Sequence, residues 1–140
     1  MSMEFNVFLR NSNFPDRAKW QKAIDEFGLP MKLDRSLDPK TNTGYVPVKL
    51  KDRESGFELY NDGSEELISD HPELAAAIGD RDTVLSFRWG GDLNEGGCSL
   101  AAAAALVKAF DAVGFDPQDG AFHTDPAELI RQAKECFGDA

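Results

Sequence analysis

The stretch Cys98–Val113 constrains the fold more than any other part of this chain. Its 16 residues contain only three polar side chains: Ser99, Lys108 and Asp111. A helix that is apolar on nearly all sides must be buried. Five consecutive alanines, Ala101–Ala105, favour helix and let neighbouring backbones approach closely. The sequence therefore predicts one buried central helix.

A buried strand is predicted immediately before this helix. Thr83–Trp89 is rich in β-branched and aromatic residues, and its alternation places three large apolar side chains on one face: Leu85, Phe87 and Trp89. Such a strand is typical of the centre of a sheet that packs against helices. We therefore expect Phe87 and Trp89 to share one core with Leu106 and Phe110 of the helix.

The glycine-rich corner between this strand and helix indicates close packing. Asp92 and Glu95 have the spacing of a capping box, which puts Gly96 and Gly97 inside the first turns. Glycine costs about 1 kcal/mol there relative to alanine, so we expect a neighbour that needs the space. A phosphate-binding loop is rejected, because Gly97 and Cys98 stand where that motif has lysine and a hydroxyl residue. At the other end, Gly114 is predicted to cap the helix.

Length and composition indicate a single soluble domain over residues 1–140. Hydrophobic residues make up 41% and charged residues 29% of the 140, which is ordinary for a globular protein. No apolar run reaches the length needed to cross a membrane, and the first ten residues do not resemble a signal peptide. We expect a cytoplasmic protein with no membrane partner, in which Cys98 and Cys136 are reduced and buried.

The charge is unevenly distributed along the chain. The net charge is −10, with +3 over residues 1–51 and −8 over residues 52–82. Such a chain should not bind nucleic acid. It should instead attract a basic protein partner to the acidic segment.

The remaining segments predict an α+β fold. Apolar alternation predicts further strands at Glu4–Arg10, Met31–Leu33, Tyr45–Lys51 and Phe57–Tyr60. Periodicity and capping patterns predict helices after Pro15, after Pro72 and after Pro126. Gly114–Phe122 is predicted to be a turn, with a short edge strand at Phe115 at most. We expect an antiparallel or mixed sheet of about five strands, with helices packed mainly on one face.

The hairpin at residues 45–60 has a predicted turn of its own. Tyr45–Lys51 and Phe57–Tyr60 flank the polar residues Asp52–Gly56, and Gly56 is expected to supply a positive φ there. Pro47 indicates a strand at a sheet edge or one with a free N–H side.

No motif for catalysis, a metal or a cofactor is found in the sequence. His71, His123 and the two cysteines lack the spacing of metal ligands, and no nucleophile motif surrounds a serine or cysteine. We therefore expect no metal and no cofactor; whether the chain is an enzyme stays open, and a non-enzymatic protein is favoured. The strand–helix corner is the one unusual arrangement, because ligands often bind where a buried strand ends. It would use Arg88, Trp89 and Asp92.

Three segments resemble small uncharacterised bacterial proteins, some of which are similar in size and acidity to immunity proteins of toxin systems. The resemblance rests on Ser55–Tyr60, on Ser86–Asp92 with the alanine-rich helix that follows, and on Gly114–Gly120. It implies a bacterial fold family and supplies no catalytic residue.

Two functions follow from the sequence as hypotheses. The first is a non-enzymatic protein-binding domain, such as an immunity or inhibitor protein for a basic toxin or another basic partner. Its binding residues would be Glu58, Tyr60, Asp62, Glu65 and Glu66. The alternative is a small-ligand-binding or enzymatic domain that uses the Arg88, Trp89 and Asp92 corner.

Overall fold

One antiparallel sheet of seven strands organises the chain. The computed structural model describes residues 3–62 and 65–137, except for the side chains of residues 62 and 65–67. The strand order is β2-β3-β4-β5-β1-β6-β7. The strands are β1 (Met3–Leu9), β2 (Met31–Leu33), β3 (Thr43–Leu50), β4 (Arg53–Asp62), β5 (Thr83–Trp89), β6 (Val113–Asp116) and β7 (Ala121–His123).

The helices lie between these strands in the chain. They are α1 (Arg17–Asp25), α2 (Glu65–Asp70), α3 (Leu74–Ile78), α4 (Leu93–Ala109) and α5 (Pro126–Phe137), with a short 3-10 turn, η1 (Asn11–Asn13), before α1. The predicted α+β class and antiparallel pairing are confirmed, but the sheet has seven strands rather than about five. The additional strands are β6 and β7, which have four and three residues and too little alternation to be distinguished from a turn.

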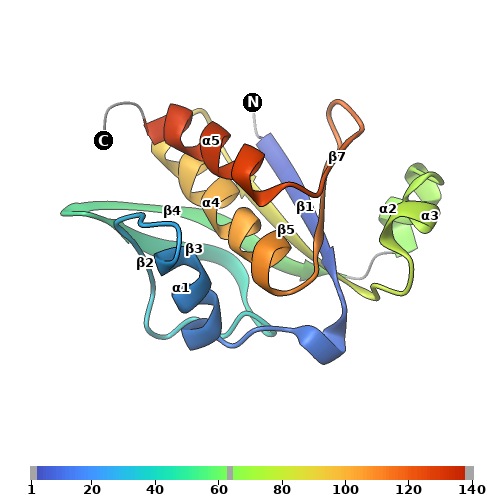
Figure 1. Cartoon of the computed structure of the whole chain (residues 1–140), viewed down its shortest axis with the longest axis horizontal. Helices are drawn as coiled ribbons and strands as arrows, with labels where there is room; N and C mark the ends of the chain where they lie inside the picture. The colour runs from blue at the N-terminus through green and yellow to red at the C-terminus, as the bar shows by residue number, and fades with distance from the viewer. Residues whose placement is uncertain (1–2, 63–64, 138–140) are drawn as a thin grey trace.

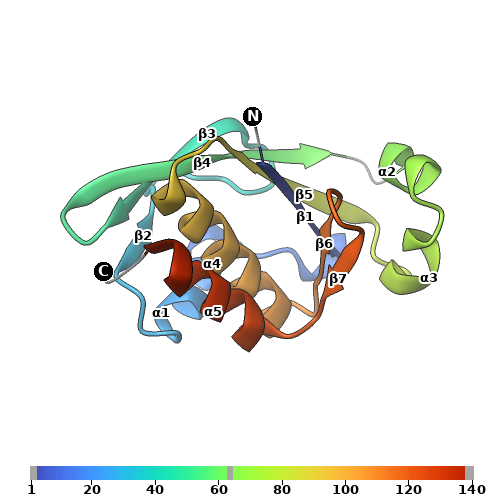
Figure 2. The ribbon, with the colours of Figure 1, turned by 90° about the horizontal axis from the view of Figure 1, so that it is seen from above.

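Helices α1, α4 and α5 cover one face of the sheet, with α4 against the strands (Figures 1 and 2). Phe87, Leu106 and Phe110 lie in one core, and Trp89 packs against its edge, as predicted. The indole nitrogen of Trp20 in α1 donates a hydrogen bond to the Ala102 carbonyl, 3.0 Å away. A side chain larger than alanine on this face of α4 would hold α1 too far away for that bond.

The two glycines inside α4 have the close neighbours that the sequence predicted. A Cβ at Gly96 would lie 2.8 Å from Nε1 of Trp89, and a Cβ at Gly97 would lie 2.5 Å from the ring of Phe137. Gly96 therefore lets the end of β5 pack against α4, and Gly97 does the same for the end of α5.

The predicted capping role of Gly114 is wrong. Helix α4 ends at Ala109, and the chain turns through Asp111, which has a φ of 52°. Gly114 lies inside β6 instead, paired with Val7 of β1. The physical reason for glycine there is the ring of Phe5, which would lie 2.7 Å from a Cβ.

The hairpin turn is also displaced from its predicted position. Leu50 pairs directly with Arg53, so the turn consists of Lys51 and Asp52 alone. Lys51 has a φ of 59°. Gly56 is not in the turn, because it lies within β4 opposite Pro47.

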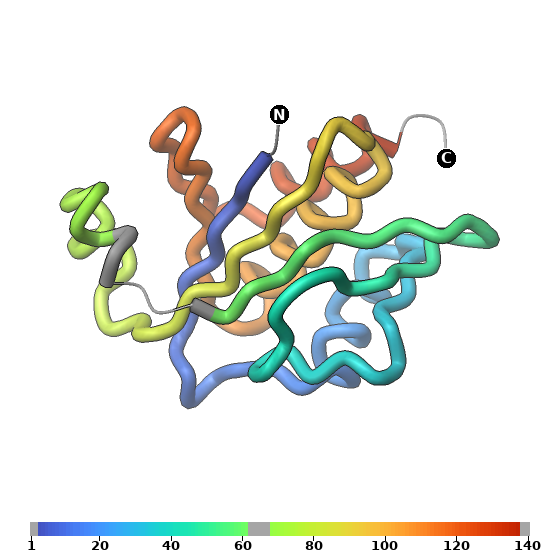
Figure 3. Tube along the Cα trace, turned by 180° about the vertical axis from the view of Figure 1, so that it is seen from behind, coloured from blue at the N-terminus to red at the C-terminus, as the bar shows by residue number. Residues whose placement is uncertain are grey.

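The second face of the sheet is covered at one end only. There α3 packs on Phe8, Val84 and Phe115, forming a small second core with Leu74 and Ile78. Over the rest of this face, along β1, β5, β4 and β3, the described part of the chain places no helix (Figure 3). Antiparallel sheets commonly leave one face to water in this way.

Candidate protein-binding face

Strand register aligns four side chains in one row across the uncovered face. Glu4 of β1 lies opposite Arg88 of β5, Arg88 lies opposite Glu58 of β4, and Glu58 lies opposite Tyr45 of β3. Directly opposed residues of an antiparallel pair have their Cβ atoms about 4.5–5.5 Å apart, on the same side of the sheet. We call Glu4, Tyr45, Glu58, Arg88 and the adjoining Tyr60 the open face.

Arg88 is fixed at the centre of the open face by two neighbours. Its Nε lies 2.9 Å from Oε1 of Glu4 in an ion pair. Its guanidinium carbon lies 4.9 Å from the centroid of the Tyr60 ring, which is a cation–π contact. The Tyr60 hydroxyl in turn donates a 2.6 Å hydrogen bond to Glu58. The four side chains thus form one connected network.

Tyr45 is an exposed aromatic member of the open face, with 54% of its surface accessible. Its hydroxyl donates a 2.9 Å hydrogen bond to the carbonyl of Ser55. That position requires Gly56, because a Cβ there would lie 2.4 Å from the Tyr45 hydroxyl oxygen. Partial desolvation and, next, the carboxylate of Glu95 raise the pKa of Tyr45, so the phenol is neutral at neutral pH. The face therefore presents a large aromatic side chain that is already held in position.

A buried polar pair supports the network from the next row of the sheet. The Ser86 hydroxyl donates a 2.8 Å hydrogen bond to Oδ1 of Asn6, and Nδ2 of Asn6 donates to Glu4 at 3.3 Å. Asn6 is fully buried and Ser86 nearly so. Because buried amide groups need partners, this pair fixes the Asn6 side chain and thereby helps to orient Glu4.

The structure places two of the five predicted partner-binding residues on the open face. Glu58 is exposed and Tyr60 half-buried there. Asp62 pairs with Val84 at the end of β4, and Glu65 and Glu66 begin α2, but their side chains lie outside the described part of the chain.

The residues of the alternative site do not converge. Arg88 and Trp89 are consecutive in β5, so their side chains point to opposite faces of the sheet. Trp89 packs beside Gly96 on the helical face. Asp92 caps α4, where its Oδ1 accepts hydrogen bonds from the backbone N–H groups of Asn94 and Glu95. Arg88 belongs to the open face, so the structure joins it to Glu58 and Tyr60 instead.

The sequence identified the strand face but missed two members of the open face. Glu4 and Tyr45 both lie on the predicted polar side of their strands. Alternation gives the side of a strand but not the neighbour across the sheet, and β1 and β5 are about 80 residues apart in the chain. A cross-strand pairing of opposite charges, such as Glu4 with Arg88, is the one signal that favours this register.

This chain matches no protein-family model, no curated protein and no solved structure. Its own geometry is therefore the basis for a functional proposal. No helix among the described residues has the length and apolarity needed to cross a membrane.

Two further observations concern metal binding and the reactivity of Cys98. The described residues contain no cluster of three or more histidine, cysteine or acidic side chains that could hold a metal ion. Cys98 is fully buried, and desolvation raises its pKa to about 11. A thiol in that state is protonated at neutral pH and is a poor nucleophile.

Proposed function

We propose that this protein is a non-enzymatic binding domain that captures a basic protein surface on its open face. The observation that carries the proposal is the row of Tyr45, Glu58, Arg88 and Glu4, supported by Tyr60, on the part of the sheet face that no described helix covers. Tyrosine and arginine are the residue types most often responsible for binding energy at protein interfaces. An immunity or inhibitor protein for a basic toxin is the sharpest form of this proposal.

Charge favours a basic partner over an acidic one. Arg88 is already paired with Glu4, so the Glu58 carboxylate gives the open face a net negative charge. Asp62 continues along the same strand, and Glu65 and Glu66 follow in α2. The chain as a whole has a net charge of −10. Such a field accelerates capture of a positively charged surface.

The preorganisation of the face supports binding with little loss of entropy. Tyr45, Tyr60 and Arg88 each have a hydrogen-bonding or cation–π partner that limits their rotamers before a partner arrives. Ordering a side chain on binding otherwise costs about 0.5–1.5 kcal/mol. Neither cysteine is in a disulfide, which is consistent with the proposed cytoplasmic location.

The test begins with site-specific photo-crosslinking in extracts of the source cell. A photoreactive residue at position 45 should trap one partner, and the same residue at position 135, on the helical side, should not. The trapped protein is then purified, and its association rate with the wild-type chain is measured over a range of salt concentrations.

Two matched variants decide whether the open face is the binding surface. Glu58→Gln keeps an oxygen that can accept from Tyr60 but removes the charge, so association at low salt should slow severalfold, with the difference vanishing at high salt. Glu135→Gln removes the same charge from α5 and should leave the rate unchanged. Tyr45→Ala should weaken affinity by about 1–2 kcal/mol, mainly through faster dissociation. Equal rates and equal salt dependence for all three variants and the wild type would refute the proposal.

A further inference from the structure

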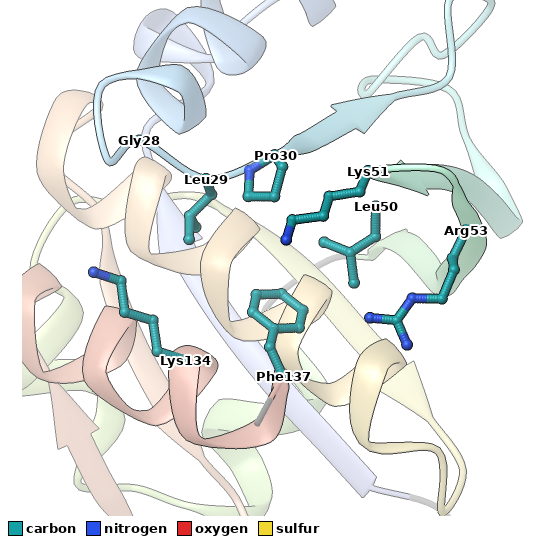
Figure 4. A pocket seen from close by; sticks show the side chains of 8 residues that line it. All are labelled: Gly28, Leu29, Pro30, Leu50, Lys51, Arg53, Lys134 and Phe137. Carbon is teal, nitrogen blue, oxygen red and sulfur yellow. The ribbon is translucent and has the colours of Figure 1, made fainter. Parts of the chain in front are cut away.

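A pocket on the helical side of the molecule has an apolar floor and a basic rim. It has a volume of about 360 Å³, within the range of small-molecule sites. Three elements meet there: the segment between α1 and β2, the β3–β4 turn and the end of α5 (Figure 4). The apolar lining is Leu29, Pro30, Leu50 and Phe137, next to Gly28.

Among the residues that the structure describes, the polar side chains that line the pocket are all cationic. Lys51 and Arg53 extend from the turn toward the ring of Phe137, and Lys134 lies on the other side of that ring (Figure 4). None of the three side chains has an ion pair or hydrogen bond within the described part of the chain. By contrast, the guanidinium groups of Arg10, Arg81, Arg88 and Arg131 all pair with carboxylates. Three cations without a carboxylate partner among the described residues thus surround an apolar floor.

The positive charge extends beyond the pocket. A wider hollow that shares Lys51 runs along β2 and β3 as far as Tyr45 of the open face. It is also lined by Arg17, Lys32, Arg35 and Lys49, with two acidic residues, Asp34 and Glu54. Basic residues thus continue from Lys51 around the edge of the sheet. Converging charges of one sign raise the local concentration of an oppositely charged ligand.

The backbone at Lys51 is a second, independent observation. Its φ of 59° falls in a region that glycine enters freely and that a side chain with a Cβ rarely adopts. Two-residue hairpin turns favour glycine, asparagine or aspartate at such positions. The N–H of Lys51 also donates a 2.8 Å hydrogen bond to the carbonyl of Pro30, which joins the turn to the opposite wall of the pocket. Lys51 thus has a backbone conformation that glycine would adopt with less strain, and its ammonium group reaches the pocket. Strain of this kind is concentrated at functional sites.

From these observations we propose that the pocket binds a small amphipathic carboxylate, with its apolar part on Leu29, Leu50 and Phe137 and its carboxylate on Lys51 and Arg53. The planar guanidinium of Arg53 matches a carboxylate with two parallel N–H donors. The ammonium of Lys51 adds a second charge-assisted hydrogen bond from the same turn. An aromatic or branched aliphatic body fits the volume and the apolar floor. The proposal does not depend on the open face, which lies on the other side of the sheet.

Three probes of the same shape test the charge requirement. Naphthoate, naphthylmethanol and naphthylmethylammonium differ only in the group that would meet Lys51 and Arg53. Each is titrated into the isotopically labelled full chain, and binding is followed by the amide shifts of residues 28, 29, 50–53 and 134–137. Naphthoate should bind at least about tenfold more tightly than the neutral probe, and the cationic probe should not bind.

Variants then assign the effect to the two residues. Arg53→Gln and Lys51→Gly should each weaken naphthoate binding about tenfold, whereas Lys22→Gln, which removes an exposed charge from α1, should not change it. Lys51→Gly also relieves the positive φ, so its thermal midpoint should equal or exceed that of the wild type. Loss of binding in a variant that is no less stable cannot be attributed to unfolding.

Two results would overturn the inference. One is equal affinity for naphthoate and naphthylmethanol, which would show that the cations do not act on the ligand. The other is evidence that naphthoate binds elsewhere. That evidence would be unchanged naphthoate binding in both Arg53→Gln and Lys51→Gly, or amide shifts confined to residues outside the pocket.

Discussion

At Gly114 a single added methyl group would meet two side chains at once. Its Cβ would lie 2.7 Å from the ring of Phe5 and 3.3 Å from the Cβ of His123. Phe5 is 3% exposed and has little room to move. We therefore predict that Gly114→Ala lowers the free energy of unfolding by about 1–3 kcal/mol, measured by urea denaturation.

Gly90→Ala is the matched control for this measurement. A Cβ at position 90 would have no atom within 4 Å, and the residue has no positive φ. Its free energy of unfolding should therefore change by less than about 0.5 kcal/mol. Equal losses for the two variants would show that the Phe5 contact is not the cause.

The two cysteines should differ in reactivity in the native state. Cys98 is fully buried and Cys136 is half-buried, so the prediction that both are buried holds only for the first. Burial raises the pKa of both thiols, to about 11 for Cys98. Because the thiolate is the reactive form, iodoacetamide at pH 7 should label Cys136 slowly and Cys98 only after unfolding, as measured by mass spectrometry of the digested protein. Labelling of Cys98 at the rate of Cys136 would contradict the buried position.

The exposed edge of β2 is covered by side chains of α1. Gln21 donates from Nε2 to the carbonyl of Met31 and accepts from the N–H of Leu33, at 2.8 and 2.7 Å. Arg17 donates to the carbonyls of Leu33 and Asp34. These contacts replace the hydrogen bonds of a missing neighbouring strand. Unpaired edges invite pairing with another chain, so the helix protects the sheet as well as covering its core.

Gln21→Leu tests how much the free energy of unfolding falls when this edge of β2 loses its hydrogen-bonding partners. The variant removes one donor and one acceptor from a buried site, and each unsatisfied backbone group costs about 1–3 kcal/mol. We predict a loss of at least about 2 kcal/mol in chemical denaturation, together with faster aggregation at high protein concentration. Lys22→Leu places the same side chain at the next, exposed position and should have little effect on stability. A Gln21→Leu protein as stable as the wild type would show that these hydrogen bonds add no net stability.

At the scale of elements, the sequence predicted the strands and the helix that local patterns determine. It missed the strand and the side-chain neighbours that depend on pairing between distant segments. The strands at Thr83–Trp89 and Met31–Leu33 and the buried helix followed from period and composition. Strand β7 did not, because Ala121–His123 lacks the apolar–polar–apolar alternation of Met31–Leu33 and its pairing with β6 is not a local pattern. The open face was half predicted for the same reason: Glu58 and Tyr60 are neighbours in one strand, whereas Glu4 and Tyr45 join them only through the register of four strands. The cationic pocket was missed entirely, since its residues come from three separate segments.

At the scale of the whole molecule, ion pairs connect three loops at one end of the sheet. Arg10, after β1, pairs with Asp80 and Asp111, and Arg81 also pairs with Asp111. Hydrogen bonds from Arg10 hold the pKa values of Asp80 and Asp111 below the ordinary carboxyl value, and the backbone N–H of Asn11 does the same for Asp82. These carboxylates join the loops before α1, before β5 and before β6.

The sign of the resulting pH dependence follows from the lowered pKa values. A carboxyl whose pKa is lower in the folded state stabilises that state above its unfolded pKa, near pH 4, and loses this contribution as the pH falls through the folded value. We predict that the urea midpoint falls between pH 5 and pH 2. At pH 5 the urea midpoint of Asp111→Asn should be lower than that of the wild type. Between pH 5 and pH 2 the midpoint of the variant should fall by less than that of the wild type. Parallel pH profiles for the two proteins would exclude Asp111 as a contributor.

The position of β1 in the sheet has a consequence for the order of folding. Both of its neighbours, β5 and β6, lie more than 70 residues further along the chain. During synthesis, the apolar residues of β1 can pair with β5 only after Trp89 has emerged from the ribosome, and with β6 only after Asp116 has emerged. The hairpin of β3 and β4, joined by a two-residue turn, can form much earlier. We therefore expect folding to start at that hairpin and β1 to be among the last strands to pair, leaving its hydrophobic segment accessible to chaperones in the interval.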